Sequence, residues 1–158
     1  MDLYLREIKP CEYLLLDDFL YEAIFQPDED NILPKDIIKE PCLQVYIKDF
    51  GKVGDECLVA VVEDEVIGGV WTRFIKSFGY VADDIVELSI SLYKDFRGKG
   101  VGTKLMLSMI DLLKRKGYRG VSLSVQKANP ASNLYKRLNF EIVRETKEDY
   151  LMMLALRS

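Results

Sequence analysis

The stretch FRGKGVGTKLM, from Phe96 to Met106, contains the residue types that a protein uses to hold a phosphate group. Three glycines alternate with other residues and two cations stand among them, the full set being Arg97, Gly98, Lys99, Gly100 and Gly102. Glycine lets the backbone come close to a ligand, and free N–H groups at the start of a helix attract anions. The question is which phosphate compound this loop would bind.

Two common nucleotide-binding loops do not fit this register. A P-loop needs a glycine followed directly by lysine, whereas Gly102 is followed by Thr103 and only then by Lys104. A dinucleotide-binding loop has the spacing Gly-x-Gly-x-x-Gly after the first strand of its fold. Here the spacing is Gly-x-Gly-x-Gly, in the middle of the chain. Binding of a nucleotide through either kind of loop is therefore disfavoured.

Any proton transfer must be done without histidine, because the sequence has none. This excludes Ser-His-Asp and Cys-His nucleophilic catalysis and most zinc sites. The three cysteines, Cys11, Cys42 and Cys57, are odd in number and lack metal-ligand spacing, so we expect reduced packing residues in a cytoplasmic protein. Carboxylates, tyrosine, cysteine, lysine or water remain as acids and bases.

The composition is that of one ordinary globular domain. The chain has 158 residues, of which 49% are hydrophobic and 30% are charged. Its 26 acidic and 22 basic residues give a net charge of −4, which offers nucleic acid no general attraction. No apolar run approaches the length of about 20 residues that spans a bilayer, and Asp2, Arg6 and Glu7 interrupt any signal-peptide core. We therefore expect neither a nucleic-acid partner nor membrane association.

Apolar periodicity places the glycine loop between a strand and a long amphipathic helix over Val101–Lys116, which Gly117 ends. The other expected helices are Tyr13–Phe25, Leu33–Lys39, Pro41–Phe50 and Asn129–Leu138, and the expected strands are Leu3–Ile8, Cys57–Glu63, Val66–Ile75, Asp84–Leu92, Arg119–Val125, Phe140–Arg144 and Tyr150–Leu156. A tight turn at Asp64-Glu65 would join the second and third strands into a hairpin. This order predicts an α+β fold around one mixed sheet.

Two motifs together resemble the GNAT family of N-acetyltransferases. The loop Arg97-Gly98-Lys99-Gly100-Val101-Gly102 is similar to the family's [Arg/Gln]-x-x-Gly-x-[Gly/Ala] acyl-CoA loop. The stretch from Asn129 to Phe140 is similar to its Asn-x-x-Ala-x-x-Leu-Tyr-x-x-x-Gly-Phe segment, slightly compressed before Tyr135 and with Asn139 in place of the usual glycine. Asparagine tolerates a left-handed backbone almost as well as glycine does. The resemblance covers residues 55–156, and residues 11–50 match as a variable helical segment on the substrate side of a single domain, 1–158.

The resemblance implies an α+β, three-layer fold, in which helices flank both faces of a mixed, mostly antiparallel sheet. It implies direct transfer of an acetyl group from acetyl-CoA to a primary amine of a small molecule or peptide, without a metal. The alternative is a non-catalytic module that binds or senses acetyl-CoA, which would keep Arg97 to Gly102 but would not need Tyr135. The sequence is silent on oligomeric state, although an exposed final strand often supports a homodimer in this fold.

In the family the acyl-CoA loop holds the pyrophosphate through backbone N–H groups. The resemblance assigns this role to Arg97, Gly98, Lys99, Gly100, Val101, Gly102 and Thr103. The residue five before the loop arginine corresponds to Leu92, whose backbone N–H would contact the acetyl oxygen. Backbone groups of Ile90 and Leu92 would pair with the pantetheine arm as an extra strand does. Asn129 would either bind the pantetheine or cap its helix.

Two residues are candidates for proton transfer. Tyr135 corresponds to the family's tyrosine that protonates the departing CoA thiolate, and its alternative role is to pack on Phe140. A phenol with a pKa near 10 can donate to a thiolate whose thiol has a pKa of about 8.5. Glu87 is the best-placed general base, because alternation puts it on one strand face with Ser89 and Ser91. It would otherwise orient the amine or face solvent while a water relay removes the proton.

The residues that could bind the acceptor amine form the least specific pattern in the sequence. Trp71 and Arg73 are two residues apart and so share a strand face that could line an acceptor pocket, although such a tryptophan is more often core. An inward-facing Arg73 would suit an amine that carries a carboxylate. Asp28, Glu29 and Asp30 would attract a cationic amine, but a solvated loop is the favoured interpretation.

Overall fold

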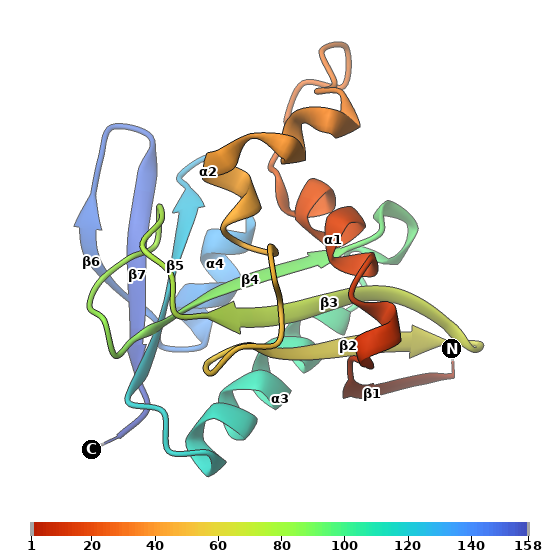
Figure 1. Ribbon diagram of the computed structural model, residues 1–158. Helices are drawn as coiled ribbons and strands as arrows, with labels where there is room; N and C mark the ends of the chain where they lie inside the picture. Colours follow the sequence, from red (N-terminus) through yellow and green to blue (C-terminus); the bar gives the residue numbers. More distant parts are fainter. Residues whose placement is uncertain (1, 158) are drawn as a thin grey trace.

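The computed structural model describes residues 2–157 and contains one seven-stranded sheet with the order β1-β2-β3-β4-β5-β7-β6 (Figure 1). The strands are β1 (Leu3–Glu7), β2 (Glu56–Val62), β3 (Glu65–Arg73), β4 (Val86–Leu92), β5 (Gly120–Gln126), β6 (Glu141–Glu145) and β7 (Asp149–Ala155). Every neighbouring pair is antiparallel except β4 and β5, which run parallel. The predicted mixed, mostly antiparallel sheet is therefore confirmed.

Helices cover both faces of this sheet, as the fold class requires. They are α1 (Leu15–Ala23), α2 (Pro41–Gln44), α3 (Val101–Arg115) and α4 (Ala131–Arg137), with 3-10 turns η1 (Pro10–Glu12), η2 (Lys35–Lys39) and η3 (Lys94–Phe96). In Figure 1, α1 and α2 lie in front of the sheet, and α3 and α4 lie behind it. We call these the α1 face and the α3 face.

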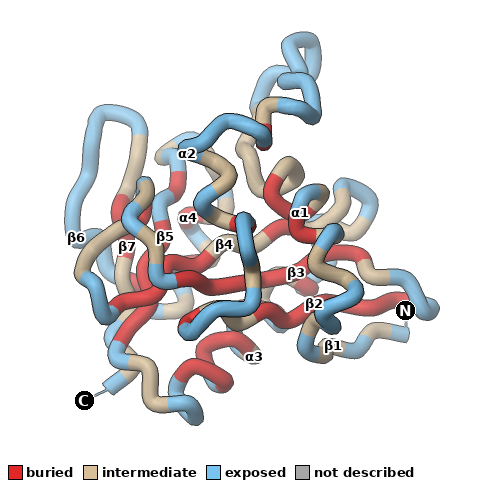
Figure 2. The backbone as a smooth tube through the Cα atoms, in the orientation of Figure 1, coloured by how far each residue is buried: buried red, intermediate tan, exposed pale blue. Residues whose placement is uncertain are grey.

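Alternation along the strands gives each face its own apolar core. On the α1 face, Leu16 and Phe19 of the helix pack in one cluster with Trp71 of β3. On the α3 face, Met106 and Met109 belong to a larger cluster with residues of the central strands. Figure 2 shows the consequence, since the central strands and much of α3 are buried while the connecting segments are exposed. The central strands thus form a rigid support between two layers.

The segments 33–39 and 41–50, on the α1 face, are less helical than their apolar spacing suggests. Residues 33–39 form only the 3-10 turn η2, and α2 ends at Gln44 rather than continuing to residue 50. Glu40 has an extended backbone, with a ψ of 134°, because the residue before a proline is excluded from the helical region. Pro41 therefore separates the two segments and prevents η2 from continuing into α2.

The turn between β2 and β3 lies one residue earlier than predicted. Its two residues are Glu63 and Asp64, with φ of 50° and 67°, and β3 already begins at Glu65. Two successive left-handed residues match the right-handed twist of a hairpin. The hairpin itself is confirmed.

Left-handed residues end both helices of the α3 face. Gly117 has a φ of 80° after α3, where its N–H donates to the carbonyl of Lys114. Asn139 has a φ of 70° after α4, so it takes the backbone conformation for which the family uses glycine. The next N–H, of Phe140, donates to the carbonyl of Tyr135 and fixes the ring of Phe140 beside that residue.

The final strand of the chain is not the exposed edge of the sheet, so that expectation is wrong. The final strand, β7, lies between β5 and β6, because β6 and β7 form a hairpin whose second strand pairs with β5. The exposed edge is β6, all five residues of which are exposed. Within residues 2–157, no helix has the length and apolar character that crossing a membrane requires.

Candidate functional site

The central feature of the site is a split in the sheet between its two parallel strands. β4 and β5 pair only at Val86 with Val121 and at Glu87 with Ser122. Beyond this point β4 continues beside β3 as far as Leu92, while β5 continues beside β7. The two strands therefore diverge, and their facing edges lose their sheet partners. The split lies at the strand whose residues Ile90 and Leu92 the family resemblance assigns to donor contacts.

The N–H groups that face this split can be identified from one hydrogen bond. The N–H of Tyr93 donates to the carbonyl of Ile67, on the β3 side. Successive residues of a strand direct their N–H groups to opposite edges. The N–H groups of Ile90 and Leu92 therefore point away from β3, towards the open edge. This is the orientation that contacts to a thioester oxygen and a pantetheine arm would need.

The glycine loop connects the end of β4 to α3. Gly98 and Gly100 have φ of 74° and 83°, and a β-carbon at either position would meet no atom within 4 Å. Glycine is thus needed here for the backbone conformation and leaves open space in front of the loop. The first α-helical hydrogen bond runs from Lys104 to Gly100, so the N–H groups of residues 101–103 have no partner within the helix. Together with the positive end of a 15-residue helix, they suit a pyrophosphate.

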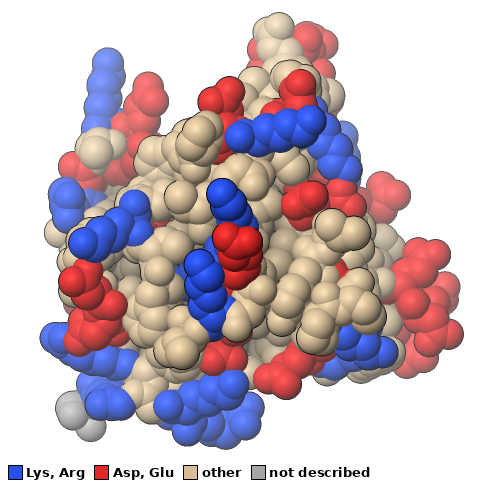
Figure 3. Space-filling model, in the orientation of Figure 1, with Lys and Arg blue, Asp and Glu red and all other residues tan. Residues whose placement is uncertain are grey.

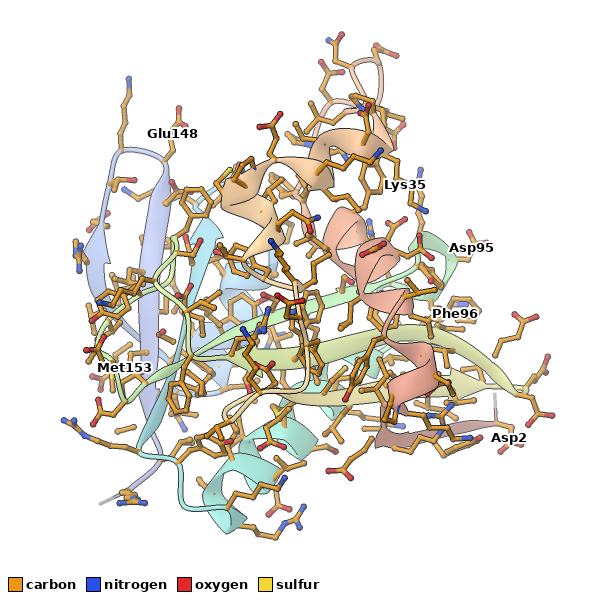
Figure 4. All side chains as sticks on the ribbon, viewed as in Figure 1. Asp2, Lys35, Asp95, Phe96, Glu148 and Met153 are labelled. Atoms are coloured by element: carbon orange, nitrogen blue, oxygen red, sulfur yellow. The ribbon has the colours of Figure 1, made fainter. Side chains whose placement is uncertain are left out.

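Arg97 holds this loop in place rather than pointing freely into solvent. Its Nε donates to the carbonyl of Leu92 at 2.9 Å, and its Nη2 donates to a carboxylate oxygen of Glu22 at 2.9 Å. Glu22 lies in α1, so one guanidinium joins β4, the glycine loop and the front helix. Figure 4 shows Asp95 and Phe96 of η3 in the same place, beside the end of α1. Direct contact of Arg97, or of the exposed loop residue Lys99, with a phosphate stays a prediction.

Tyr135 lies on the α3 face, in the cluster that also holds β5 residues of the split. The residue is 7% exposed, and its ring centroid lies 6.0 Å from that of Phe140. Burial raises the pKa of Tyr135 to about 12, so the phenol keeps its proton at neutral pH. The packing role is therefore supported by the ring contact. The role of Tyr135 as proton donor stays a prediction, because the raised pKa keeps the proton in place but also makes the phenol a weaker acid.

Asn129 takes up the capping role. Its side-chain oxygen accepts a hydrogen bond from the N–H of Ala131 at 2.9 Å, in the turn that starts α4. Its contact with the pantetheine arm stays a prediction. The capping hydrogen bond already uses the side-chain oxygen of Asn129, which makes a contact through that oxygen less favourable.

Glu87 lies at the last pair of residues before the split, on the α1 face. It is 3% exposed, and its two oxygens accept hydrogen bonds from the N–H groups of Ser77 at 3.1 Å and Gly79 at 2.8 Å. Burial raises the pKa of Glu87, and the two hydrogen bonds oppose this shift. The carboxylate thus fastens the loop between β3 and β4 over the sheet. Its role as general base stays a prediction. The structure makes that role less favourable, because both carboxylate oxygens already accept hydrogen bonds.

Trp71 and Arg73 do share a strand face, but both are enclosed. The indole of Trp71 is 1% exposed and donates to the carbonyl of Tyr46 at 3.0 Å. The guanidinium of Arg73 pairs with Asp55 at 2.9 Å and donates to the carbonyls of Val45 and Lys48. We therefore assign both residues to holding the segment that follows α2, and the geometry gives their acceptor-binding role no support.

Sequence reasoning missed the loop between β3 and β4, because its connections are not local. The hydroxyl of Ser122 donates to the carbonyl of Gly79 at 2.5 Å, so this loop is tied to β5 as well as to β4. No periodicity or motif in residues 74–85 indicates either connection. In the part of the chain that the structure describes, no group of histidine, cysteine and carboxylate side chains could hold a metal ion.

Gly79→Ala should destabilise the protein by about 1–3 kcal/mol, because overpacking a filled site forces the backbone to move. Its β-carbon would lie 2.9 Å from a carboxylate oxygen of Glu87 and 3.1 Å from the backbone nitrogen of Ser124. Gly102→Ala is the matched control, since its β-carbon would meet only Leu134, at 3.9 Å. Urea unfolding measures both variants, and equal stabilities would contradict the tight seating of the loop.

The split parallel pair lies beside the glycine-rich helix start, so the groups that the family resemblance assigns to acetyl-CoA are brought together. The sequence profile of the acetyltransferase (GNAT) family matches residues 17–140. The chain therefore belongs to the GNAT acetyltransferase family, and the family resemblance is confirmed. Its enzyme class and its acetyl-CoA co-substrate are those of this family.

Three similar proteins illustrate the likeness. N-alpha-acetyltransferase 30 of Schizosaccharomyces pombe is 25% identical over 121 residues, which cover 76% of this chain and 80% of that protein. The probable N-acetyltransferase camello of Xenopus tropicalis is 31% identical over 86 residues, covering 52% of this chain but only 37% of its own length. The solved structure of Salmonella typhimurium yncA with its cofactor acetyl-CoA has a TM-score of 0.73 at 20% identity, covering 100% of this chain and 96% of that one.

Proposed function

We propose that this protein transfers an acetyl group from acetyl-CoA directly to a primary amine of a small molecule or peptide. The observation that carries the proposal is the split between β4 and β5 directly beside the glycine loop that starts α3. One feature offers N–H groups to a thioester and the other offers N–H groups to a pyrophosphate. A single extended acyl-CoA would use both.

The donor would lie along the open edge of β4. The N–H groups of residues 101–103 would hold its pyrophosphate, with added positive charge from the exposed Lys99. The N–H of Ile90 would pair with the pantetheine arm, and the N–H of Leu92 would donate to the acetyl oxygen, where negative charge grows during the reaction.

The reaction then needs one new bond, one broken bond and two proton movements. The amine nitrogen bonds to the acetyl carbon, and the bond from that carbon to sulfur breaks. Tyr135 donates its proton to the departing thiolate, as a phenol kept protonated by its surroundings can do. The proton lost by the amine passes to Glu87 or, through water, to solvent. Both carboxylate oxygens of Glu87 accept backbone hydrogen bonds, so we favour the water route.

The acceptor would approach from the α1 face, opposite Tyr135. The Schizosaccharomyces pombe relative is an N-alpha-acetyltransferase, which supports a peptide amine among the acceptors to test.

We also propose a cytoplasmic location and a homodimer. The exposed edge strand β6, with Ile142 and Val143 at 42% and 49% exposure, is the surface a second copy would use.

Ligand-dependent thermal unfolding tests the donor assignment. Because a ligand stabilises the state that binds it, CoA at 100 times its Kd should add about 2.7 kcal/mol to the free energy of unfolding. ATP and NAD should leave the melting temperature unchanged. Stabilisation by ATP or NAD, and none by CoA, would contradict the proposed donor site.

A further inference from the structure

The loop between β3 and β4, residues 74–85, is fastened at three points to the sheet beside the split. The N–H groups of Ser77 and Gly79 donate to Glu87, and the carbonyl of Gly79 accepts from Ser122. Glu87 and Ser122 are the last pair that β4 and β5 form. The tip of this loop therefore sits where the two strands part.

The tip lies on the acceptor side of the sheet. Glu87 is opposite Arg73 in the register between β3 and β4, so both side chains project from the same face. Arg73 contacts the segment after α2, which belongs to the α1 face. Figure 1 shows the loop passing in front of β5 next to α2. The donor groups, by contrast, lie along the edge of β4 and on the α3 face.

Phe78 stands between the two fastened residues and is 63% exposed. An exposed phenylalanine on a mobile loop would need no explanation, but this one is held by fixed neighbours on both sides. Gly79 also brings the loop closer to β5 than any other residue would allow, since its β-carbon would lie 3.1 Å from a backbone atom of Ser124. The backbone of Phe78 is therefore held in place beside the split, and its side chain is exposed there.

The charges of the same loop are neutralised. Lys76 pairs with Asp83 at 3.7 Å, and Asp84 pairs with Arg119 at 2.5 Å. Over the whole α1 face, Figure 3 shows acidic and basic side chains of both signs interspersed, with the acidic ones densest at the end that carries the β2–β3 turn. An acceptor recognised through several positive charges finds no matching acidic patch on this loop, whereas an apolar group finds the ring of Phe78.

We propose that Phe78 is a specificity-determining residue that contacts an apolar group of the acceptor, close to its amine nitrogen. The inference rests on the proposed function and narrows its substrate class. The acceptor is a primary amine with an apolar or aromatic group a few bonds from the nitrogen. Arylalkylamines and peptides that begin with a large apolar residue share this chemistry.

Steady-state acetylation of two matched pairs of acceptors tests this inference. One pair is 2-phenylethylamine and ethylamine, and the other is a tetrapeptide beginning with leucine and the same peptide beginning with glycine. Phe78→Ala should lower kcat/KM about tenfold for the apolar member of at least one pair and less than about twofold for its partner. The pair that responds identifies the source of the amine. Phe78→Leu should retain most of the activity, because it keeps an apolar side chain.

Leu107→Ala is the control, since Leu107 is an exposed apolar residue, 51% exposed, on α3. It should change none of the four values. An equal loss on both members of each pair, or no loss on any, would overturn the role of Phe78 while leaving the proposed function intact. Activity of the wild type on other amines but on none of these four would have the same effect. No acetylation of any amine would overturn both.

Discussion

Tyr135→Phe should lower kcat by about 100-fold, the usual loss when a general acid is removed, with little change in the KM for acetyl-CoA. The substitution removes only a hydroxyl group, so the ring still packs 6.0 Å from Phe140 and the core stays filled. Stopped assays of thiol release with a saturating amine measure the effect. A non-catalytic acetyl-CoA module would bind the donor equally well with either residue.

The pH dependence of the wild type adds a second readout. Because burial raises the pKa of Tyr135 to about 12, its proton is retained across the neutral range, and kcat should not fall on the alkaline side below about pH 10. Tyr150→Phe is the matched control on β7. A Tyr135→Phe variant with unchanged kcat would restrict Tyr135 to a packing role, and a fall of the wild-type kcat well below pH 10 would contradict the retained proton.

Arg73→Met should lower the free energy of unfolding by about 3–5 kcal/mol, because it leaves a buried carboxylate without its partner. The side chains of Arg73 and Asp55 are only 6% and 2% exposed, and their atoms approach to 2.9 Å. The same substitution removes the donors for the carbonyls of Val45 and Lys48. Urea unfolding of the two variants, Arg73→Met and Asp55→Asn, and of their combination measures the coupling.

The exposed pair of Arg115 and Asp111 is the matched control. Its atoms also approach to 2.9 Å, but both side chains are 68% exposed, so Arg115→Met should cost less than about 0.5 kcal/mol. A similar small loss for Arg73→Met would mean that the segment after α2 is held by other contacts, and that the enclosed position of Arg73 has no energetic weight.

The elements that sequence predicts well are those whose signal is local. α3 follows from the spacing of its apolar residues, and its end at Gly117 follows from glycine's access to positive φ. The glycine loop and the Tyr135 segment lie in contiguous stretches, so family likeness can find them. In the front segments, Pro41 restricts Glu40 and so breaks the chain between η2 and α2, while apolar spacing alone predicted longer helices there.

The features that sequence could not predict join residues far apart in the chain. The order of β7 and β6 depends on which hairpin strand reaches β5, and alternation is the same for either choice. Arg97 meets Glu22 across 75 positions, and Arg73 meets Asp55 across 18. Phe78 carries no motif at all, and hydrogen bonds between its neighbours and the distant residues Glu87 and Ser122 hold its backbone in place.

The most direct test of the central claim is the balance between thiol released and amide formed. Purified protein is incubated with acetyl-CoA and, separately, with polyamines, amino acids, aminoglycosides, peptides and arylalkylamines, and both products are quantified. The account predicts that at least one amine is acetylated in equal amount to the CoA released, at a rate that Tyr135→Phe lowers about 100-fold. Tight binding of CoA with no acetylation of any amine by the wild type would contradict it.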